Sequence, residues 1–164
     1  MSSKKILISL FTAISIISLI SCNPSKKYEK EEQDQIDNYL INNPTLTFVQ
    51  KESGLYFYSV QEGTGIMPVL HDTVYVKYTG SFLSGQVFDT NVGKADSLKF
   101  PCLEGWMIPG FDEGVSYLKQ GGKAVILCPS WLAYGVAGRY GFVSGYTPLL
   151  FEIELVKVKK SKGK

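Results

Sequence analysis

Histidine and cysteine, which supply many nucleophiles, general bases and metal ligands, are scarce in this chain of 164 residues, with one His and three Cys. The single histidine, His71, precedes Asp72 at an expected turn, and we assign it no catalytic role. The stretch 104–118 places large apolar side chains beside the bend expected at Pro109-Gly110, as a binding site would, but contains neither Cys nor His. A site there has to act without a thiol nucleophile or an imidazole base.

An excess of charge of one sign is also lacking. The formal net charge is +2 at pH 7, and removal of residues 1–21 would take away Lys4 and Lys5, leaving 15 basic and 15 acidic residues. Recognition of nucleic acid normally requires a strongly basic face. We therefore expect no nucleic-acid partner, whereas 45% hydrophobic and 20% charged residues fit a globular protein.

Long hydrophobic runs are missing too. The longest apolar run, residues 6–20, follows Lys4 and Lys5 and is shorter than the ~20 residues that a membrane-spanning helix needs. A short apolar run after positive charges is typical of a secretory signal.

The end of this run, Leu19-Ile20-Ser21-Cys22, resembles the lipobox of bacterial lipoproteins, in which the chain is cut before the cysteine and the cysteine is lipidated. We therefore predict a lipoprotein signal peptide at 1–21 and lipidation of Cys22. Two or more acyl chains would give stable anchoring to a membrane of the bacterial cell envelope, with the protein facing the periplasm. The alternatives are an uncleaved anchor and an ordinary signal followed by an unrelated cysteine.

The rest of the chain divides by its hydrophobic pattern. Residues 23–27 are expected to form a short tether, and residues 28–42 a polar helix with Ile36 and Leu40 on one side, which packs on something or stands as a stalk. The terminal lysine-rich run is expected to be solvated. The predicted segments are the signal at 1–21, the tether and N-terminal helix at 22–46, the folded domain at 47–158 and the basic tail at 159–164.

Two further cysteines, Cys102 and Cys128, lie among apolar residues. An exported protein could join them in a disulfide. A buried free thiol is equally ordinary in such surroundings, and we favour two free thiols in the core.

From residue 55 onward the apolar residues recur with a period of two, as in strands. Val74, Val76 and Tyr78 share one face of such a segment, and Gly-containing links such as Ser84-Gly85 favour antiparallel hairpins. The expected strands are 55–60, 73–79, 86–90, 97–100, 123–128 and 150–158.

One helix is expected within this strand-rich region, at residues 111–118. Pro109 stands at its start, and Asp112 and Glu113 lie in the first turn, where the helix dipole favours acids. A helix this short has to pack against the sheet to be stable. The sequence therefore predicts an α+β fold, with an antiparallel sheet of five to six strands curved around one short helix and preceded by an N-terminal helix.

Three segments then resemble FKBP-type peptidyl-prolyl cis-trans isomerases: VYVKYTGSFLSGQVFDT at 74–90, WMIPGFDEGVSYLKQGGKAVILCPSWLAYG at 106–135, and LLFEIELVKV at 149–158. Each motif alone is weak evidence, but their order and spacing over about residues 63–158 are specific to that family. The resemblance implies a half-barrel sheet wrapped on a short helix. It also implies catalysed rotation of X–Pro bonds in exported proteins, with no metal and no cofactor.

The resemblance further implies an apolar pocket in which Asp89, Tyr134 and Ile108 carry catalysis. The Tyr134 hydroxyl and the Ile108 backbone N–H would bind the substrate carbonyl. Asp89, the one buried polar group of the family pocket, would orient Tyr78 or face the carbonyl carbon. The substrate-binding residues it implies are Tyr78, Phe88, Leu98, Phe100, Met107, Ile108, Phe111, Tyr134, Val143 and Phe151.

This chain departs from the family at several of these positions. Phe111 stands where many members have Trp, Leu98 replaces an aromatic residue, and Lys94 stands where relatives often carry Arg. Arg139-Tyr140 belongs to an overhanging loop unlike the usual His- and Pro-rich versions. The pocket survives these changes, whereas substrate preference and sensitivity to macrolide inhibitors depend on them.

The expected partners are proline-containing polypeptides, the membrane through Cys22, and macrolide inhibitors. The alternative to an isomerase is an envelope-tethered, proline-binding chaperone with little or no isomerase activity. Taken one at a time, the aromatic residues at strand spacing would count as core. Asp89 alone would count as a turn residue, and Asp112 and Glu113 as charges at a helix end rather than an acid–base pair.

Overall fold

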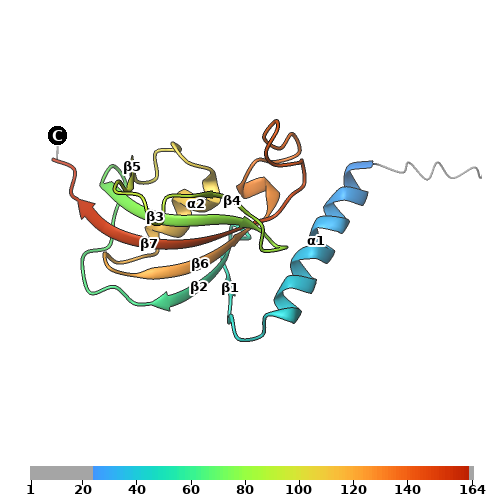
Figure 1. The fold of residues 1–164 in the computed structure, drawn as a ribbon, viewed down its shortest axis with the longest axis horizontal. Coiled ribbons are helices and arrows are strands. Elements are labelled where there is room, and N and C mark those ends of the chain that lie inside the picture. The colour runs from blue at the N-terminus through green and yellow to red at the C-terminus, as the bar shows by residue number, and fades with distance from the viewer. Residues whose placement is uncertain (1–23, 163–164) are drawn as a thin grey trace, which may run out of the picture.

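One antiparallel sheet of seven strands organises the protein, whose computed structural model describes residues 24–162 (Figure 1). The spatial order is β1-β2-β6-β7-β3-β4, and β5 pairs with β3. The predicted α+β architecture with an N-terminal helix is confirmed. The strands are β1 (Val49–Gln50), β2 (Tyr56–Gln61), β3 (Thr73–Phe82), β4 (Val87–Thr90), β5 (Leu98–Pro101), β6 (Lys123–Cys128) and β7 (Leu149–Lys159).

The prediction of five to six strands missed β1. This strand is two residues long and both of its residues are exposed, so it carries no hydrophobic period. The other predicted strands are present, with ends shifted by at most three residues, which is close to the usual uncertainty at the ends of elements.

The strand β3 is shared by two short partners along its length. One half, Thr79–Ser81, pairs with β4, and the other half, Thr73–Val76, pairs with β5. Between the two partners, the side chain of Asn91 accepts a hydrogen bond from the Tyr78 N–H at 2.8 Å and donates one to the Val76 carbonyl at 2.9 Å. Asn91 thus supplies hydrogen-bond partners for the β3 backbone between the stretches that pair with β4 and β5.

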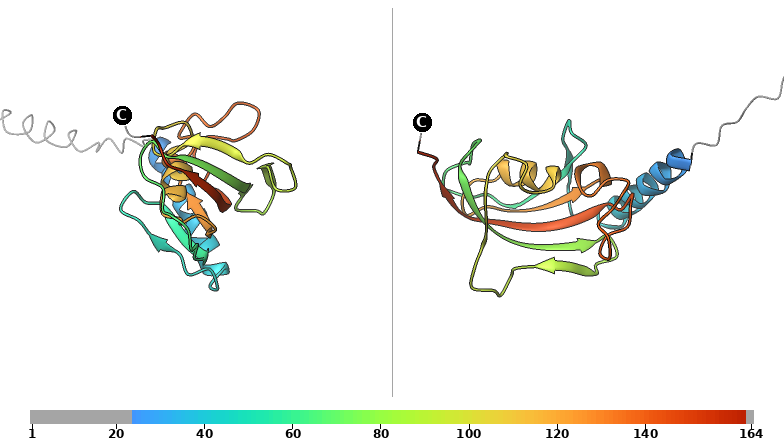
Figure 2. Two further views of the ribbon diagram at one scale, coloured as in Figure 1. Left: turned by 90° about the vertical axis from the view of Figure 1, so that its left-hand side faces the viewer. Right: turned by 90° about the horizontal axis from the view of Figure 1, so that it is seen from above.

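The sheet curves around α2 (Pro109–Ser116), as Figure 2 shows. Pro109 lies in the first turn as predicted, although the helix ends before Leu118. Glycines allow a close approach to β6, since a methyl group on Gly110 would lie 2.6 Å from the Cys128 Sγ and one on Gly114 would lie 2.8 Å from the Ile126 Cδ1. Such distances are too short for any side chain.

The helix α1 (Pro24–Asn42) begins earlier than predicted, so the expected tether is wrong for residues 24–27. Proline is favoured in the first turn of a helix, where its missing N–H has no partner to lose. Ion pairs four residues apart extend the helix through this region, with Lys27 to Glu31 at 3.6 Å and Lys30 to Asp34 at 2.7 Å.

The apolar side of α1 packs on the face of the sheet opposite α2. Ile36 is fully buried there against Tyr56, Val125, Leu127 and Leu150. The strand β6 is therefore covered on both sides, and its burial no longer alternates. Hence α1 is part of the folded body, and of the two alternatives, packing or a stalk, the structure shows packing.

Residues 159–162 are exposed, as expected for a solvated tail, but the first three of them also contact the fold. Lys159 belongs to β7. The carboxylate of Asp72, 1% exposed, accepts hydrogen bonds from the Lys160 Nζ at 2.8 Å and from the Ser161 N–H at 2.9 Å. A buried carboxylate requires such donors, so residues 159–161 are held by the fold.

Both cysteines of the described region, Cys102 and Cys128, are buried free thiols, as favoured. The predicted signal peptide and Cys22 lie outside the described residues. Within residues 24–162, no helix is long and apolar enough to span a membrane.

Candidate functional site

A cavity of about 410 Å³ opens between the start of α2, the β3–β4 edge of the sheet and the segment after the 3₁₀ helix η1 (Ser130–Leu132). All but two of the predicted site residues line it. The lining residues are Tyr78, Phe88, Asp89, Leu98, Trp106, Met107, Ile108, Phe111, Tyr134, Arg139 and Phe151.

Aromatic rings packed edge to face form the floor and walls of the cavity. The Phe111 ring centroid lies 5.4 Å from that of Tyr78 and 5.3 Å from that of Phe151, with interplanar angles of 78° and 76°. Phe88 meets Phe151 at 5.8 Å and 89°. Edge-to-face pairs are favourable because the positive edge of one ring meets the negative face of the next. The rings fix one another, so the cage is formed before a ligand arrives.

One polar pair lies in this apolar wall. The Tyr78 hydroxyl donates a hydrogen bond of 2.6 Å to the Asp89 carboxylate. Burial of the phenol, and then this hydrogen bond, raise the pKa of Tyr78 above its usual range, so the phenol stays protonated. Asp89 is exposed and not buried as expected, because β4 is an edge strand that turns this carboxylate to solvent.

Two of the predicted hydrogen-bond donors are free at the cavity. Among the described residues, nothing accepts from the Tyr134 hydroxyl or from the Ile108 backbone N–H. Ile108 is the N-cap of α2 and Pro109 follows it, so this N–H precedes the helical hydrogen-bond ladder. The cage therefore offers an incoming carbonyl two donors without breaking an existing bond.

The edge of the cavity that carries Trp106, Met107 and Ile108 is held by Asp112, a residue expected only to favour the helix end. Its side chain makes no cap bond. One carboxylate oxygen accepts from the Leu103 N–H at 2.7 Å and the other from the Gly105 N–H at 3.1 Å. Asp112 is 4% exposed, so these bonds are shielded from water.

Two predicted binding residues do not line the cavity. Phe100 lies on the same face of β5 as Leu98 but is covered by Phe111, with ring centroids 6.0 Å apart. Val143 is 5% exposed and sits in the main core, because its backbone pairs with Arg139 in a tight turn that directs its side chain inward.

Two lining residues were missed. Trp106 is 67% exposed at the rim. The Arg139 guanidinium carbon lies 5.9 Å from the Tyr134 ring and 4.9 Å from the Phe142 ring. Trp106 directly precedes the predicted Met107, and that adjacency was the available signal. The resemblance placed Arg139 in the overhanging loop but did not predict that it lines the cavity, because its position depends on the path of that loop.

No group of three His, Cys, Asp or Glu side chains within residues 24–162 could hold a metal ion. The described residues that line the cavity include no Ser, Thr, Cys or His, the side chains that most often act as nucleophiles or general bases. The arrangement can bind an apolar ring and a carbonyl group, and it can do so without forming a covalent bond.

Comparison with known proteins agrees with this geometry. A family profile described as FKBP-type peptidyl-prolyl cis-trans isomerase matches residues 65–156. FkpA of Escherichia coli, an FKBP-type peptidyl-prolyl cis-trans isomerase, is 36% identical over an alignment of 142 residues that covers 82% of this chain and 52% of that protein. The FK506-binding protein of Neisseria meningitidis is 36% identical over 105 residues, 64% of this chain and 96% of that protein.

Solved structures give the same result. A peptidyl-prolyl cis-trans isomerase of Pseudomonas syringae superposes with a TM-score of 0.71 and 26% identity, covering 84% of this chain and 97% of that chain. The FkpA structure gives 0.66 and 33%, covering 82% and 64%. The chain spans about half the length of the curated relatives it matches first. The match over more than half of this chain, the identity to the relatives and the shared fold show that the chain belongs to the FKBP-type peptidyl-prolyl cis-trans isomerase family.

Proposed function

We propose that the protein is a peptidyl-prolyl cis-trans isomerase that rotates X–Pro bonds by non-covalent binding of the twisted amide. The observation that carries the proposal is the aromatic cage around Phe111 with two free donors, the Tyr134 hydroxyl and the Ile108 N–H, at its edge.

Such a cage suits this reaction because no bond is made or broken. Amide resonance opposes rotation with a barrier of about 18–20 kcal/mol. The cis and trans forms of X–Pro differ by only about 0.5–1 kcal/mol. A catalyst therefore has to bind the twisted amide better than either planar form. Loss of resonance makes the twisted carbonyl less polar, so it loses less on leaving water for an apolar cavity.

Each part of the cavity has a place in this scheme. The proline ring lies on Phe111, between the walls formed by Phe88 and Phe151. The Tyr134 hydroxyl and the Ile108 N–H bind backbone carbonyls next to the proline and fix the chain on one side of the rotating bond. Since the Asp89 carboxylate accepts a hydrogen bond from the Tyr78 hydroxyl, the role of Asp89 is to hold the Tyr78 ring in place in the cavity wall.

The test compares neighbouring residues of β4. Phe88→Ala removes a wall of the cage, and we expect kcat/KM for an X-Pro peptide, measured by NMR exchange, to fall about tenfold, equivalent to about 1.4 kcal/mol. Val87→Ala is the matched control, because Val87 is 50% exposed and does not line the cavity. The proposal fails if the parent protein does not accelerate exchange, or if both variants keep parental activity.

We also propose that Cys22 is lipidated and holds the protein at the bacterial cell envelope, with exported proline-containing polypeptides as clients. The support is the lipobox-like Leu19-Ile20-Ser21-Cys22 after a short apolar run. The helix α1 starts at Pro24 and packs on the sheet, so such an anchor would hold the domain close to the membrane. Cys22→Ser should move the protein from the detergent phase to the aqueous phase, and continued partition into detergent would contradict lipidation.

Macrolide inhibitors are proposed as ligands of the same cavity. The support is its apolar lining and the similarity to a protein named for FK506 binding. A macrolide should compete with the X-Pro peptide and raise its apparent KM. Unchanged kinetics at a high concentration of macrolide would contradict this proposal.

A further inference from the structure

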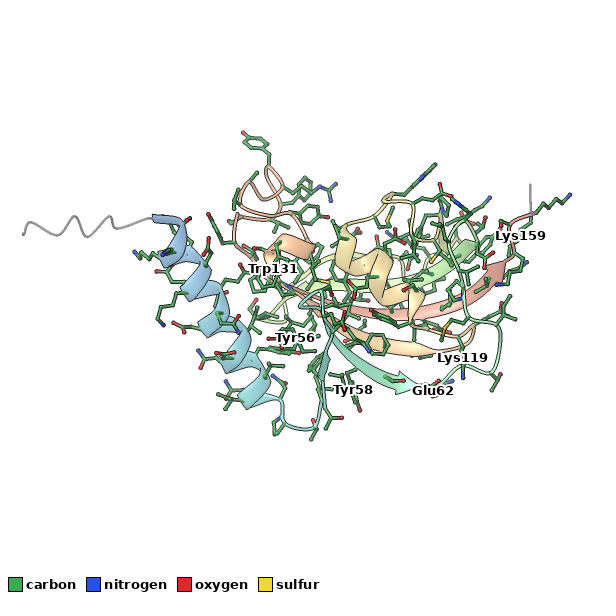
Figure 3. All side chains as sticks on the ribbon, turned by 180° about the vertical axis from the view of Figure 1, so that it is seen from behind. Tyr56, Tyr58, Glu62, Lys119, Trp131 and Lys159 are labelled. Carbon is green, nitrogen blue, oxygen red and sulfur yellow. The ribbon has the colours of Figure 1, made fainter. Side chains whose placement is uncertain are left out.

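The helix α1 forms hydrogen bonds with η1, the 3₁₀ helix next to the cavity, in addition to its apolar packing on the sheet. Glu32 of α1 is 2% exposed, and its carboxylate accepts hydrogen bonds from the backbone N–H of Ser130 and from the Ser130 hydroxyl, the latter at 2.7 Å. Ser130 is the first residue of η1, four positions before Tyr134. Figure 3 shows η1, marked by Trp131, at the end of the sheet beside α1, with Lys119 and Lys159 at the opposite end.

A second contact lies one helical turn earlier. The rings of Tyr28 and Tyr146 stack with centroids 5.3 Å apart and an interplanar angle of 22°. Tyr146 closes the loop that follows η1, and it adopts a left-handed backbone conformation with φ 54°. Glu32 and Tyr28, four residues apart, lie on the same face of α1. This face therefore contacts both ends of the segment 130–146.

Hydrogen bonds within this segment connect the two ends to the residues that flank Tyr134. The Ser130 carbonyl accepts from the N–H groups of Ala133 and Gly135, both at 2.8 Å. The Gly135 carbonyl in turn accepts from the Tyr146 N–H at 3.1 Å. Tyr134 thus lies between Ala133 and Gly135, whose backbone N–H groups donate hydrogen bonds to the Ser130 carbonyl. Ser130 in turn donates hydrogen bonds to the Glu32 carboxylate.

The choice of a carboxylate at position 32 calls for a reason beyond stability. Burial of a carboxylate is costly unless its oxygens accept hydrogen bonds. An apolar side chain of similar size at the same position would often stabilise a fold as well as the carboxylate does, or better. Buried polar groups can instead fix one arrangement of the groups they bond. Here the arrangement fixed is that of η1 and the residues after it.

We propose that α1 is a positioning element of the site, in which Glu32 and Tyr28 hold the segment 130–146 so that the Tyr134 hydroxyl stays over the aromatic cage. The inference deepens the proposed isomerase function and rests on it. The helix next to the predicted membrane anchor is, on this account, also a part that the catalytic geometry needs.

The test uses the full chain in detergent and the variant Glu32→Ala. We expect kcat/KM for an X-Pro peptide to fall about fivefold, mainly in kcat, because the hydroxyl contact matters most in the twisted state. Glu32→Gln, which keeps an acceptor for one Ser130 donor, should recover most of the loss. In the Tyr134→Phe background, Glu32→Ala should change kcat/KM less than about twofold, since the group it positions is already gone.

Two controls separate positioning from loss of stability. Val158→Ala weakens the core at the far end of β7 and should leave kcat/KM unchanged at equal fraction folded. Tyr28 is 48% exposed, so the Tyr28→Ala variant should fold even if the Glu32→Ala variant does not. We expect Tyr28→Ala to lower kcat/KM about twofold, because it removes the stacking on Tyr146. The inference is overturned if Glu32→Ala has the same factor with and without the Tyr134 hydroxyl, or if Val158→Ala lowers activity as much.

A readout independent of activity keeps this inference separate from the proposed function. Glu32→Ala should speed hydrogen exchange at the Gly135 and Tyr146 amides about tenfold, with the Leu155 amide in β7 unchanged. Unchanged exchange at Gly135 and Tyr146 overturns the inference. If the parent chain catalyses no isomerisation while these amides respond, the proposed function falls and the positioning by α1 stands.

Discussion

The edge of the cavity formed by Trp106, Met107 and Ile108 depends on one buried carboxylate, and Asp112→Asn tests this directly. The parent residue accepts from two backbone donors, the Leu103 N–H at 2.7 Å and the Gly105 N–H at 3.1 Å. An amide has one oxygen, so its NH₂ group would face the second N–H.

The magnitude follows from these two bonds. Leaving a buried donor unsatisfied costs about 1–3 kcal/mol, and a hydrogen bond to a charged group contributes about 1.5–3 kcal/mol. We expect Asp112→Asn to lower the free energy of unfolding by about 2 kcal/mol and Asp112→Ala, which leaves both donors bare, by about 3–4 kcal/mol. This is a large share of the roughly 5–15 kcal/mol that stabilises an ordinary domain.

The assay is urea unfolding followed by tryptophan fluorescence, together with kcat/KM on an X-Pro peptide. Trp106 directly follows Gly105, so its emission should also shift in the folded variant. Glu113→Gln is the matched control, because Glu113 is only partly buried and accepts from side chains, the Ser53 hydroxyl at 2.8 Å and the Tyr117 hydroxyl at 2.9 Å. Its expected loss is about 0.5–1 kcal/mol.

The reasoning about Asp112 would be refuted by an Asp112→Asn variant as stable as the parent with an unchanged Trp106 emission. It would also be refuted if Asp112→Asn and Glu113→Gln lost the same free energy, since burial would then not decide the cost.

Three further predictions concern other parts of the molecule. Burial acts to raise the pKa of Asp72, but Lys160 and two backbone N–H groups outweigh it and hold the pKa below the ordinary value of 3.8. The ionised Asp72 carboxylate therefore stabilises the fold fully above pH 3.8, and this stabilisation is lost as the pH falls through the folded-state pKa. Below about pH 4 the unfolding free energy of Asp72→Asn should therefore fall less steeply than that of the parent. An equally steep fall in both proteins would contradict the contact between Asp72 and Lys160. Burial raises the pKa of the Cys102 thiol to about 12 and that of Cys128 still further, so a thiol reagent at about pH 8 should modify both only as fast as the protein opens, and rapid labelling would contradict burial. Phe111→Trp adds volume at a buried position and should change the KM for an X-Pro peptide about threefold or more, with a loss of stability of about 1–3 kcal/mol; an unchanged KM would remove Phe111 from the ligand contact.

The pattern of the sequence predicted the sheet well because most strands bury one face. In β7, Phe151, Ile153 and Leu155 are buried while Glu152 and Glu154 lie on the other side. The start of α1 was missed because Pro24, taken as part of a tether, is a favoured first residue of a helix.

The site shows where sequence reasoning stops. The aromatic residues Tyr78, Phe88 and Phe111 were placed by motif, and the structure brings them together. Asn91 and Asp112 were missed as organising residues, because each forms hydrogen bonds with backbone groups outside its own helix or strand and no periodic pattern records such a bond.

The exposure of single residues was the other failure. Asp89 was expected to be buried and lies exposed on an edge strand, whereas Val143 was expected at the cavity and lies in the core. Both depend on how a loop or edge turns in space. A motif gives the residue type at a position and leaves its orientation to the surrounding packing.

The most direct test of the central claim, that a free hydroxyl at the edge of an aromatic cage assists rotation about the X–Pro bond, is the kcat/KM of Tyr134→Phe. Tyr140→Phe is the matched control, since Tyr140 lies on the same segment and is fully exposed. We expect Tyr134→Phe to lower kcat/KM about two- to twelvefold, as the loss of one hydrogen bond of about 0.5–1.5 kcal/mol predicts, with Tyr140→Phe at the parental value. Equal activity of parent and Tyr134→Phe would contradict the account.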